Sequence, residues 1–260
     1  MNIFLTNDDG VDARGLFALY EELSKAHAVT VVAPGYERSA TGHSISLHEP
    51  LRARKVAKPG DGLWYAVFGT PADCVKLGLL KLLGARPDLV ISGINAGVND
   101  GVNVFYSGTV AAAREACLNG IPAMAVSIAG KKPAHYQSAA VVAKGLVSRL
   151  AAWKVSAGTL LNVNVPDLPI DAIAGIRFTR LDMAFPGDWV EKRRDPRGGG
   201  YYWYGYTTPT VIENSGTDRE ALNRKYVSVT PLACDMTDTD LLKRLRQAPL
   251  DLPQKEDIKA

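Results

Sequence analysis

The stretch Asn2–Gly15, NIFLTNDDGVDARG, places a short apolar run directly before two adjacent carboxylates and a glycine. A continuous apolar run of this length, bounded by polar residues, indicates a buried strand. The segment that follows carries Leu16, Leu19, Tyr20 and Leu23 at helical spacing, so a helix is expected there. A strand, a short loop and a helix in this order are typical of βαβ units around a parallel sheet.

The same alternation continues as far as Pro166. Strands are predicted over 27–34, 51–57, 64–69, 87–93, 121–129 and 159–166, and helices over 71–83, 109–120 and 138–153. Thr70-Pro71 supplies a helix start, with the threonine as N-cap and the proline in the first helical position. The fold class that follows is α/β, with a mostly parallel sheet.

Beyond Pro166 the pattern is less regular. Strands are expected over 174–181, 201–206 and 226–232 without regular helices between them, followed by a last helix over 238–247 and a frayed tail over 254–260. Residues 189–206, WVEKRRDPRGGGYYWYGY, predict a hairpin that reaches away from the body. This hairpin is either a mobile surface feature or an oligomerisation arm, because aromatic residues are enriched in interface cores.

Composition limits the classes of function. The chain has 260 residues, of which 47% are hydrophobic, and its 30 Lys and Arg against 27 Asp and Glu give no electrostatic argument for stable nucleic-acid binding. Cys74, Cys117 and Cys234 are isolated and odd in number, so reduced, packed thiols are expected. No signal peptide or membrane-spanning stretch is visible, which predicts a cytoplasmic protein without a membrane partner.

Three polar segments follow predicted strands, at residues 7–9, 33–44 and 91–114. Ligands of open α/β sheets bind beyond the carboxyl ends of the strands, so these segments are expected to meet. A divalent cation would remove the mutual repulsion of Asp8 and Asp9. With only oxygen donors nearby, Mg²⁺ or Mn²⁺ is expected, with Ca²⁺ as an alternative. The competing interpretation is a capping pair, with one acid at the start of the next helix.

A glycine-rich loop lies in the third segment. GINAGVNDGVN, residues 93–103, lets backbone amides approach an anion, and Ser107-Gly108-Thr109 opens a helix whose dipole favours phosphate. Capping of that helix by Ser107 or Thr109 explains the same residues without a ligand. A cation held by carboxylates beside an amide-lined anion site indicates phosphoryl-group chemistry.

Five motifs now stand in order along the chain, at residues 2–15, 31–46, 69–75, 87–116 and 216–232. Together they resemble the SurE family of stationary-phase survival proteins, which are metal-dependent 5′/3′-nucleotidases. The resemblance implies a Rossmann-like three-layer α/β/α core over 1–166. It also implies a C-terminal region over 167–260, packed on the core as one unit, with an oligomerisation hairpin at about 183–206 and a terminal helix. A homodimer or homotetramer formed through exchanged arms is expected.

The resemblance also implies site residues. The metal ligands carry over onto Asp8, Asp9, Ser39 and Asn95, and the phosphate contacts carry over onto Asn99, Ser107, Gly108 and Thr109. The sequence departs from the family pattern at one point: many members have Ser-Gly, whereas this chain has Ser39-Ala40. His43, in the same loop, is expected to be hydrogen-bonded locally, outside the chemistry.

The predicted reaction is hydrolysis of nucleoside 5′- and 3′-monophosphates to nucleoside and phosphate, with short polyphosphate as a further candidate substrate. One divalent cation per subunit would assist attack by water, with Asp8 and Asp9 as the catalytic acids. Three alternatives stay open. In the first, Asp8 or Asp9 would be a covalent nucleophile, as in the haloacid-dehalogenase-like phosphatases, although those enzymes use Asp-x-Asp and the acids here are adjacent. In the second, the chain would be a receiver-like switch. In the third, it would be a nucleotide sensor without turnover.

Overall fold

A mixed sheet runs through the body of the molecule, and its order is β3-β4-β2-β1-β5-β6-β7-β11-β8. The computed structural model describes residues 1–58, 60, 62–150, 152–153, 155–185, 187–207 and 210–247. The strands of this sheet are β1 (Asn2–Thr6), β2 (Ala28–Pro34), β3 (Ala53–Lys55), β4 (Leu63–Val67), β5 (Leu89–Ala96), β6 (Ala123–Ile128), β7 (Leu160–Val165), β8 (Gly175–Phe178) and β11 (Tyr226–Leu232). Within this sheet, β3 pairs antiparallel with β4 and β11 pairs antiparallel with β7, and the other described pairings in it are parallel.

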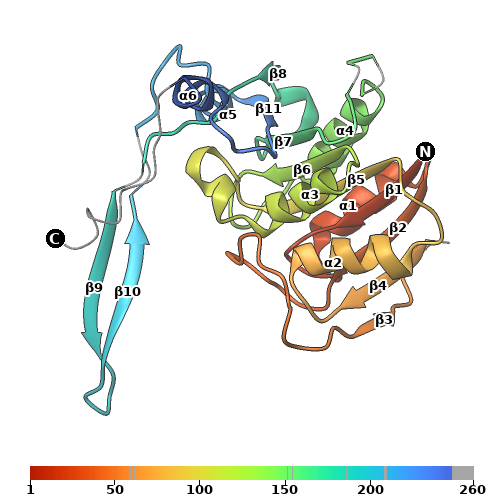
Figure 1. The fold of residues 1–260 in the computed structure, drawn as a ribbon, viewed down its shortest axis with the longest axis horizontal. Helices are drawn as coiled ribbons and strands as arrows, with labels where there is room; N and C mark the ends of the chain where they lie inside the picture. Colours follow the sequence, from red (N-terminus) through yellow and green to blue (C-terminus); the bar gives the residue numbers. More distant parts are fainter. Residues whose placement is uncertain are drawn as a thin grey trace.

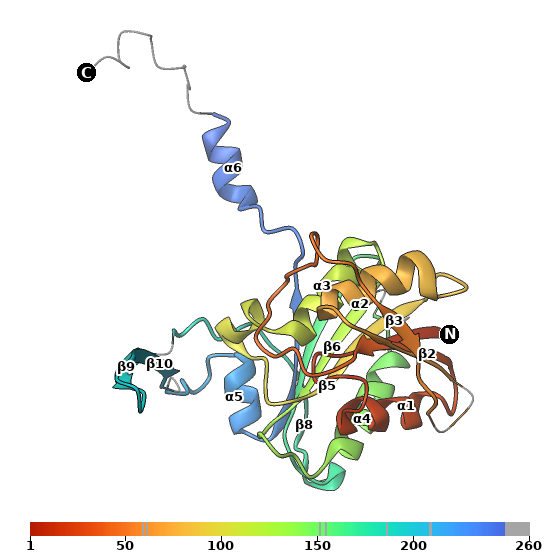
Figure 2. The same cartoon turned by 90° about the horizontal axis from the view of Figure 1, so that it is seen from below.

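Helices cover both faces of the sheet, and Figure 2 shows α1 with α4 on one side and α2 with α3 on the other. Their bounds are α1 (Arg14–Leu23), α2 (Pro71–Leu77), α3 (Gly108–Leu118) and α4 (Tyr136–Val147). The apolar stripe of α1 is buried as its spacing predicts, with Leu16, Leu19 and Leu23 inside one core, while Val110 and Ala113 of α3 belong to the second core. The predicted α/β class and its three layers are therefore confirmed.

Local capping fixes where two helices start. Thr70 and Asp73 form a reciprocal capping box at the start of α2, with Pro71 in the first helical position. The helical path then continues as a π-helical turn over Gly78–Leu82, which accounts for the predicted end near Leu83. Ser107 caps α3, because its side chain accepts a hydrogen bond from the Val110 amide at 3.0 Å.

The C-terminal region contains a helix that the sequence did not predict. Helix α5 (Asp218–Asn223) lies between β10 (Gly200–Tyr206) and β11, so the expectation of strands without regular helices was wrong here. Six residues are fewer than two helical turns, too short for a periodic apolar pattern to stand out. The capping of α5 by Thr217, whose side chain accepts from the Glu220 amide, was the readable signal.

The predicted hairpin is present. β9 (Asp188–Arg194) pairs antiparallel with β10, and Figure 1 shows this arm extending away from the body. Large aromatic side chains are exposed on it, including Trp189, Tyr202 and Trp203. Helix α6 (Thr239–Leu245) also stands off the body, as Figure 2 shows, and the predicted tail over 254–260 lies outside the described residues.

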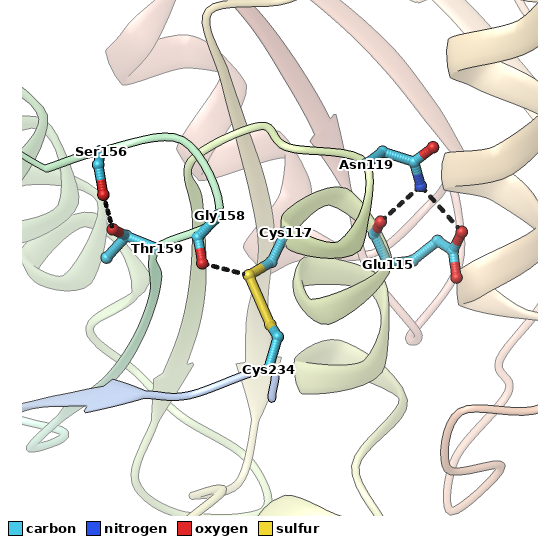
Figure 3. The surroundings of a disulfide bond; sticks show 7 residues. All are labelled: Glu115, Cys117, Asn119, Ser156, Gly158, Thr159 and Cys234. Atoms are coloured by element: carbon cyan, nitrogen blue, oxygen red, sulfur yellow. Dashed lines mark hydrogen bonds between the residues drawn. A yellow bond between two sulfur atoms is a disulfide. The ribbon is translucent and has the colours of Figure 1, made fainter. Parts of the chain in front are cut away.

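Two of the three cysteines are paired, which corrects the expectation of reduced thiols. A disulfide joins Cys117 at the end of α3 to Cys234 just after β11 (Figure 3). Residues separated by 117 positions carry no local spacing signal, and only the fold brings them together. Cys74 is a buried free thiol as expected, and burial raises its pKa. The cytoplasmic location stays a prediction.

None of the described helices is long and apolar enough to cross a bilayer.

Candidate active site

The turn after β1 is built by Asn7. Its side-chain amide donates to the Gly10 carbonyl at 2.9 Å, and its side-chain oxygen accepts from the Gly10 amide at 3.2 Å. The Asp8 and Asp9 side chains take no part in the bonds that close this turn. Helix α1 has Ala13 as its N-cap and no side-chain capping bond, so the capping-pair interpretation does not hold.

Asp8 is held by the start of α3. Its side chain is only 6% exposed, and one carboxylate oxygen accepts a hydrogen bond from the buried Thr109 hydroxyl. Gly108 is required beside it, because a Cβ there would lie 2.9 Å from the Asp8 Oδ2 atom. The Thr109 hydroxyl therefore orients the Asp8 carboxylate, and Gly108 leaves room for it. Thr109 and Gly108 do not line the cleft described below.

Asp9 lies closer to the surface and contacts the last residue of β5. Its Oδ2 atom accepts from the Ala96 amide at 3.3 Å. Burial raises the pKa of Asp8 to about 6, with the neighbouring charge of Asp9 adding to it and hydrogen bonding to Thr109 opposing it. Burial also raises the pKa of Asp9, with a further contribution from the charge of Glu37. Both acids therefore hold their negative charge at an energetic cost in the absence of a cation.

Strand β5 contains a bulge just before the loop that follows it. The ladder between β5 and β6 shifts register between Gly93 and Asn95, and a Cβ on Gly93 would lie 2.2 Å from the Val126 carbonyl oxygen. Asn95 then donates its side-chain amide to the Gly97 carbonyl at 2.7 Å. This contact uses the nitrogen, so the side-chain oxygen of Asn95 is the atom suited to a metal.

Asn99 is fixed by polar residues on the two neighbouring strands. Its side-chain amide donates to the Ser127 hydroxyl at 2.8 Å, and its backbone amide donates to the Asn164 side chain at 2.8 Å. The Asn162 side chain donates to the Asn99 carbonyl at 2.7 Å. The sequence reasoning missed these three supports. The alternating asparagines of β7 were the available signal, since buried polar side chains need partners.

Helix α5 supports the same loop from outside the sheet. The Asp218 carboxylate accepts from the Gly101 amide at 2.8 Å and from the Asp182 amide at 2.9 Å. Arg219 pairs with Asp100 at 3.2 Å, and both side chains are buried. The C-terminal motif therefore contributes to the site indirectly, by holding the glycine-rich loop in place.

The loop after β2 carries Ser39 at the protein surface, where its hydroxyl donates to Glu37 at 2.5 Å. The Arg38 amide donates to the Asp8 carbonyl at 2.7 Å and ties this loop to the acidic turn. His43 lies farther along the loop and contacts the Glu115 carboxylate at 2.9 Å. This partner lies on α3 and not in the same loop, and His43 is not among the residues that line the cleft described below, so its place outside the chemistry stays a prediction.

These elements enclose one cleft of about 830 Å³, hereafter the acidic cleft. Six predicted site residues line it, namely Asp8, Asp9, Ser39, Asn95, Asn99 and Ser107. Further lining residues, which the sequence reasoning did not place at the site, are Glu37, Tyr106, Lys131, Phe185, Asp188, Tyr204 and Tyr206. The charged side chains among the described lining residues are four carboxylates and one lysine, so the cleft by itself repels a phosphate dianion.

The donor set of the cleft suits a hard divalent cation. Asp8, Asp9, Ser39 and Asn95 offer carboxylate, hydroxyl and amide oxygens, the donor types that Mg²⁺ and Mn²⁺ take. Within the described part of the chain, no cluster of three or more His, Cys, Asp or Glu side chains is arranged to hold a metal. The residues fit a site of two carboxylates and neutral oxygens, and they do not fit a zinc cluster.

The sheet and the acidic cleft define a Rossmann-like α/β protein with its ligand site beyond the carboxyl ends of β1 and β5. The family model described as "Survival protein SurE" matches residues 3–186. The chain belongs to the SurE family.

Similar proteins cover almost the whole chain. The protein named 5′-nucleotidase SurE of Desulfatibacillum aliphaticivorans is 48% identical over 254 residues, which are 97% of this chain and 100% of that protein. The protein of the same name from Heliobacterium modesticaldum is 47% identical, covering 94% of this chain and 90% of that one. The crystal structure of the SurE protein from Aquifex aeolicus matches with a TM-score of 0.83 at 39% identity, covering 95% of this chain and 98% of that one.

Proposed function

We propose that this protein is a divalent-metal-dependent phosphomonoesterase that hydrolyses nucleoside 5′-monophosphates. The observation that carries the proposal is the pair of adjacent acids, the buried Asp8 and the half-buried Asp9, with raised pKa values beside the start of α3. The relatives named 5′-nucleotidase SurE support the class of reaction. Activity on 3′-monophosphates and on short polyphosphate belongs to the same proposal as a secondary range of substrates.

Asp8, Asp9, Ser39 and Asn95 are the residues that would hold the cation. When bound, such an ion supplies Lewis-acid polarisation of a phosphate oxygen and lowers the pKa of water. It also offsets the excess of carboxylates in the acidic cleft, which otherwise disfavours an anionic substrate.

The chain's own residues position the substrate. Ser107 lines the cleft at the N-terminus of α3, where the helix dipole favours the negative charge of a phosphate group. Asn99 is locked by its bonds to β6 and β7, so its side chain keeps one orientation toward the cleft. Thr109 acts through Asp8 by fixing the direction of that carboxylate. Water is the proposed nucleophile, because Asp8 and Asp9 are assigned to the cation.

The test is phosphate release from a panel of nucleoside monophosphates, using protein stripped with chelator and then supplied with Mg²⁺ or Mn²⁺. Activity is expected to return with the metal, and Asp9→Asn is expected to lose at least ~100-fold in kcat/KM by removing a ligand. Asp12→Asn is the matched control, because Asp12 follows in the same segment, is 79% exposed and lies outside the acidic cleft.

Metal binding without phosphate release from any substrate would contradict the proposal and favour a nucleotide sensor. A phosphoryl adduct on Asp8 or Asp9, found by mass spectrometry after acid quenching during turnover, would replace water attack with the covalent route.

The exposed aromatics of the arm also support self-association, and we propose that copies of this chain assemble through β9 and β10 into a dimer or tetramer.

A further inference from the structure

Four large aromatic side chains line the outer part of the acidic cleft. They are Tyr106, Phe185, Tyr204 and Tyr206, with exposed fractions of 62%, 65%, 65% and 63%. Aromatic rings left in water at this density mark a binding surface, since scattered single exposures are the ordinary case. The metal and phosphate assignments use none of these four rings, so they require a separate explanation.

The rings come from two segments that are far apart in the sequence. Tyr106 lies on the loop that leads into α3, whereas Phe185, Tyr204 and Tyr206 lie at the base of the arm. Figure 1 shows the arm leaving the body beside the segment that joins β5 to α3. The neighbouring carboxylate of Asp188 raises the pKa of Tyr204, and burial and nearby Tyr106 add to this effect.

The size and layout of the cleft indicate what these rings contact. Its volume of about 830 Å³ is in the range of sites for drug-sized ligands and far exceeds the needs of a phosphate group. Tyr106 directly precedes Ser107, so an aromatic surface adjoins the anion-binding end of α3. A ligand with a phosphate at that end and a flat aromatic group beyond it matches this order of contacts.

We propose that Tyr106 and Tyr204 form a nucleobase-stacking subsite, and that Asp188 accepts a hydrogen bond from the ribose hydroxyls. This inference rests on the proposed function, since it names the part of a nucleotide that the outer cleft holds. Every base offers a π-face, so stacking tolerates all four bases and sets only a modest preference for the larger purines. The subsite discriminates nucleotides from phosphoesters that lack a base.

Binding of adenosine without its phosphate gives a test that does not depend on turnover. We expect Tyr106→Ala and Tyr204→Ala each to weaken adenosine affinity ~10-fold in a saturation-transfer NMR titration, which corresponds to the loss of one stacking contact. Tyr204→Phe should keep most of the affinity, because it retains the ring. Unchanged affinity in both alanine variants would overturn the inference.

Tyr202→Ala is the matched control. Tyr202 has the same residue type and an exposure of 64%, and it lies two positions from Tyr204 on the same face of β10 but outside the cleft. Its loss should leave adenosine affinity unchanged.

Kinetics separate the subsite from the reaction. The two alanine variants should raise KM for adenosine monophosphate ~10-fold and leave hydrolysis of ribose 5-phosphate unchanged, because that substrate has no base. If both variants lost activity equally on the two substrates and also sedimented with a lower mass, the rings would belong to an interface between copies of the chain. That result would overturn the inference. If the wild type hydrolyses neither substrate and the variants still lose adenosine affinity, the proposed function fails and the subsite stands.

Discussion

At the scale of single residues, Ala40 is in a backbone conformation that its side chain disfavours. Its φ is +54°, in the left-handed region that favours glycine. Replacing it removes the steric cost but adds conformational entropy to the unfolded chain. We therefore expect Ala40→Gly to raise the free energy of unfolding by about 0.5 kcal/mol in urea titrations.

The control for this variant is Ala57→Gly. Ala57 is also an exposed loop alanine, but its φ is not positive. Glycine should therefore lower the free energy of unfolding there by about 0.5–1 kcal/mol. Destabilisation of similar size at both positions would show that the left-handed geometry of Ala40 carries no cost.

At the scale of elements, one buried carboxylate joins two helices. Glu22 on α1 accepts from Lys144 of α4 at 2.7 Å and from Gln137 at 3.0 Å, and it also pairs with Lys25. Hydrogen bonds from Lys144 and Lys25 lower the pKa of Glu22 to about 2. A lowered folded-state pKa stabilises the protein above the ordinary pKa, and that contribution disappears as the pH falls toward 2.

We expect Glu22→Gln to lower the free energy of unfolding by about 1–2 kcal/mol at pH 6, a modest value because solvent screens the half-exposed lysines. The difference from the wild type should shrink steadily between pH 4.5 and pH 2. Urea unfolding across that range measures it, with the exposed neighbour Glu21→Gln as the control. A difference independent of pH would assign the effect to packing.

The arm permits a second change at this scale. Val190 and Tyr204 face each other in the hairpin register, so residues 191–203 can be replaced by an Asn-Gly turn that joins them directly. This shortened arm keeps Asp188, Tyr204 and Tyr206 at the cleft. We expect it to reduce the mass of the assembly in analytical ultracentrifugation, because Tyr202 and Trp203 are lost. If the variant kept the mass of the wild-type assembly, the arm would be only a surface hairpin.

At the scale of the whole molecule, the regular features were predictable from sequence. The spacing of apolar residues distinguishes strands from helices, and the alternation of the two predicts a parallel sheet. The polar segments after β1, β2 and β5 lie together as strand-end reasoning predicts. The glycine turn at Asn119-Gly120 and the Thr70 cap also stand where their residue types place them.

The remaining features depend on contacts between distant segments. The Cys117–Cys234 disulfide, the pairing of Arg219 with Asp100 and the aromatic wall of the cleft each join residues that are far apart in the chain. No spacing rule reaches across such separations. Thr109 shows that sequence motifs also do not reveal side-chain partners. Its hydroxyl donates a hydrogen bond to Asp8, and this contact is seen only in the structure.

The position of β11 has a consequence for how the protein is made. β11 lies between β7 and β8 in the sheet, although it is the last strand in the chain. During synthesis, the apolar strand β7 therefore waits with one edge unpaired until Leu232 has left the ribosome. Unpaired apolar edges are sites where nascent chains associate. A chain that stops before Tyr226 lacks the strand that joins β7 to β8, and it would carry the unpaired edge of β7 into the cell.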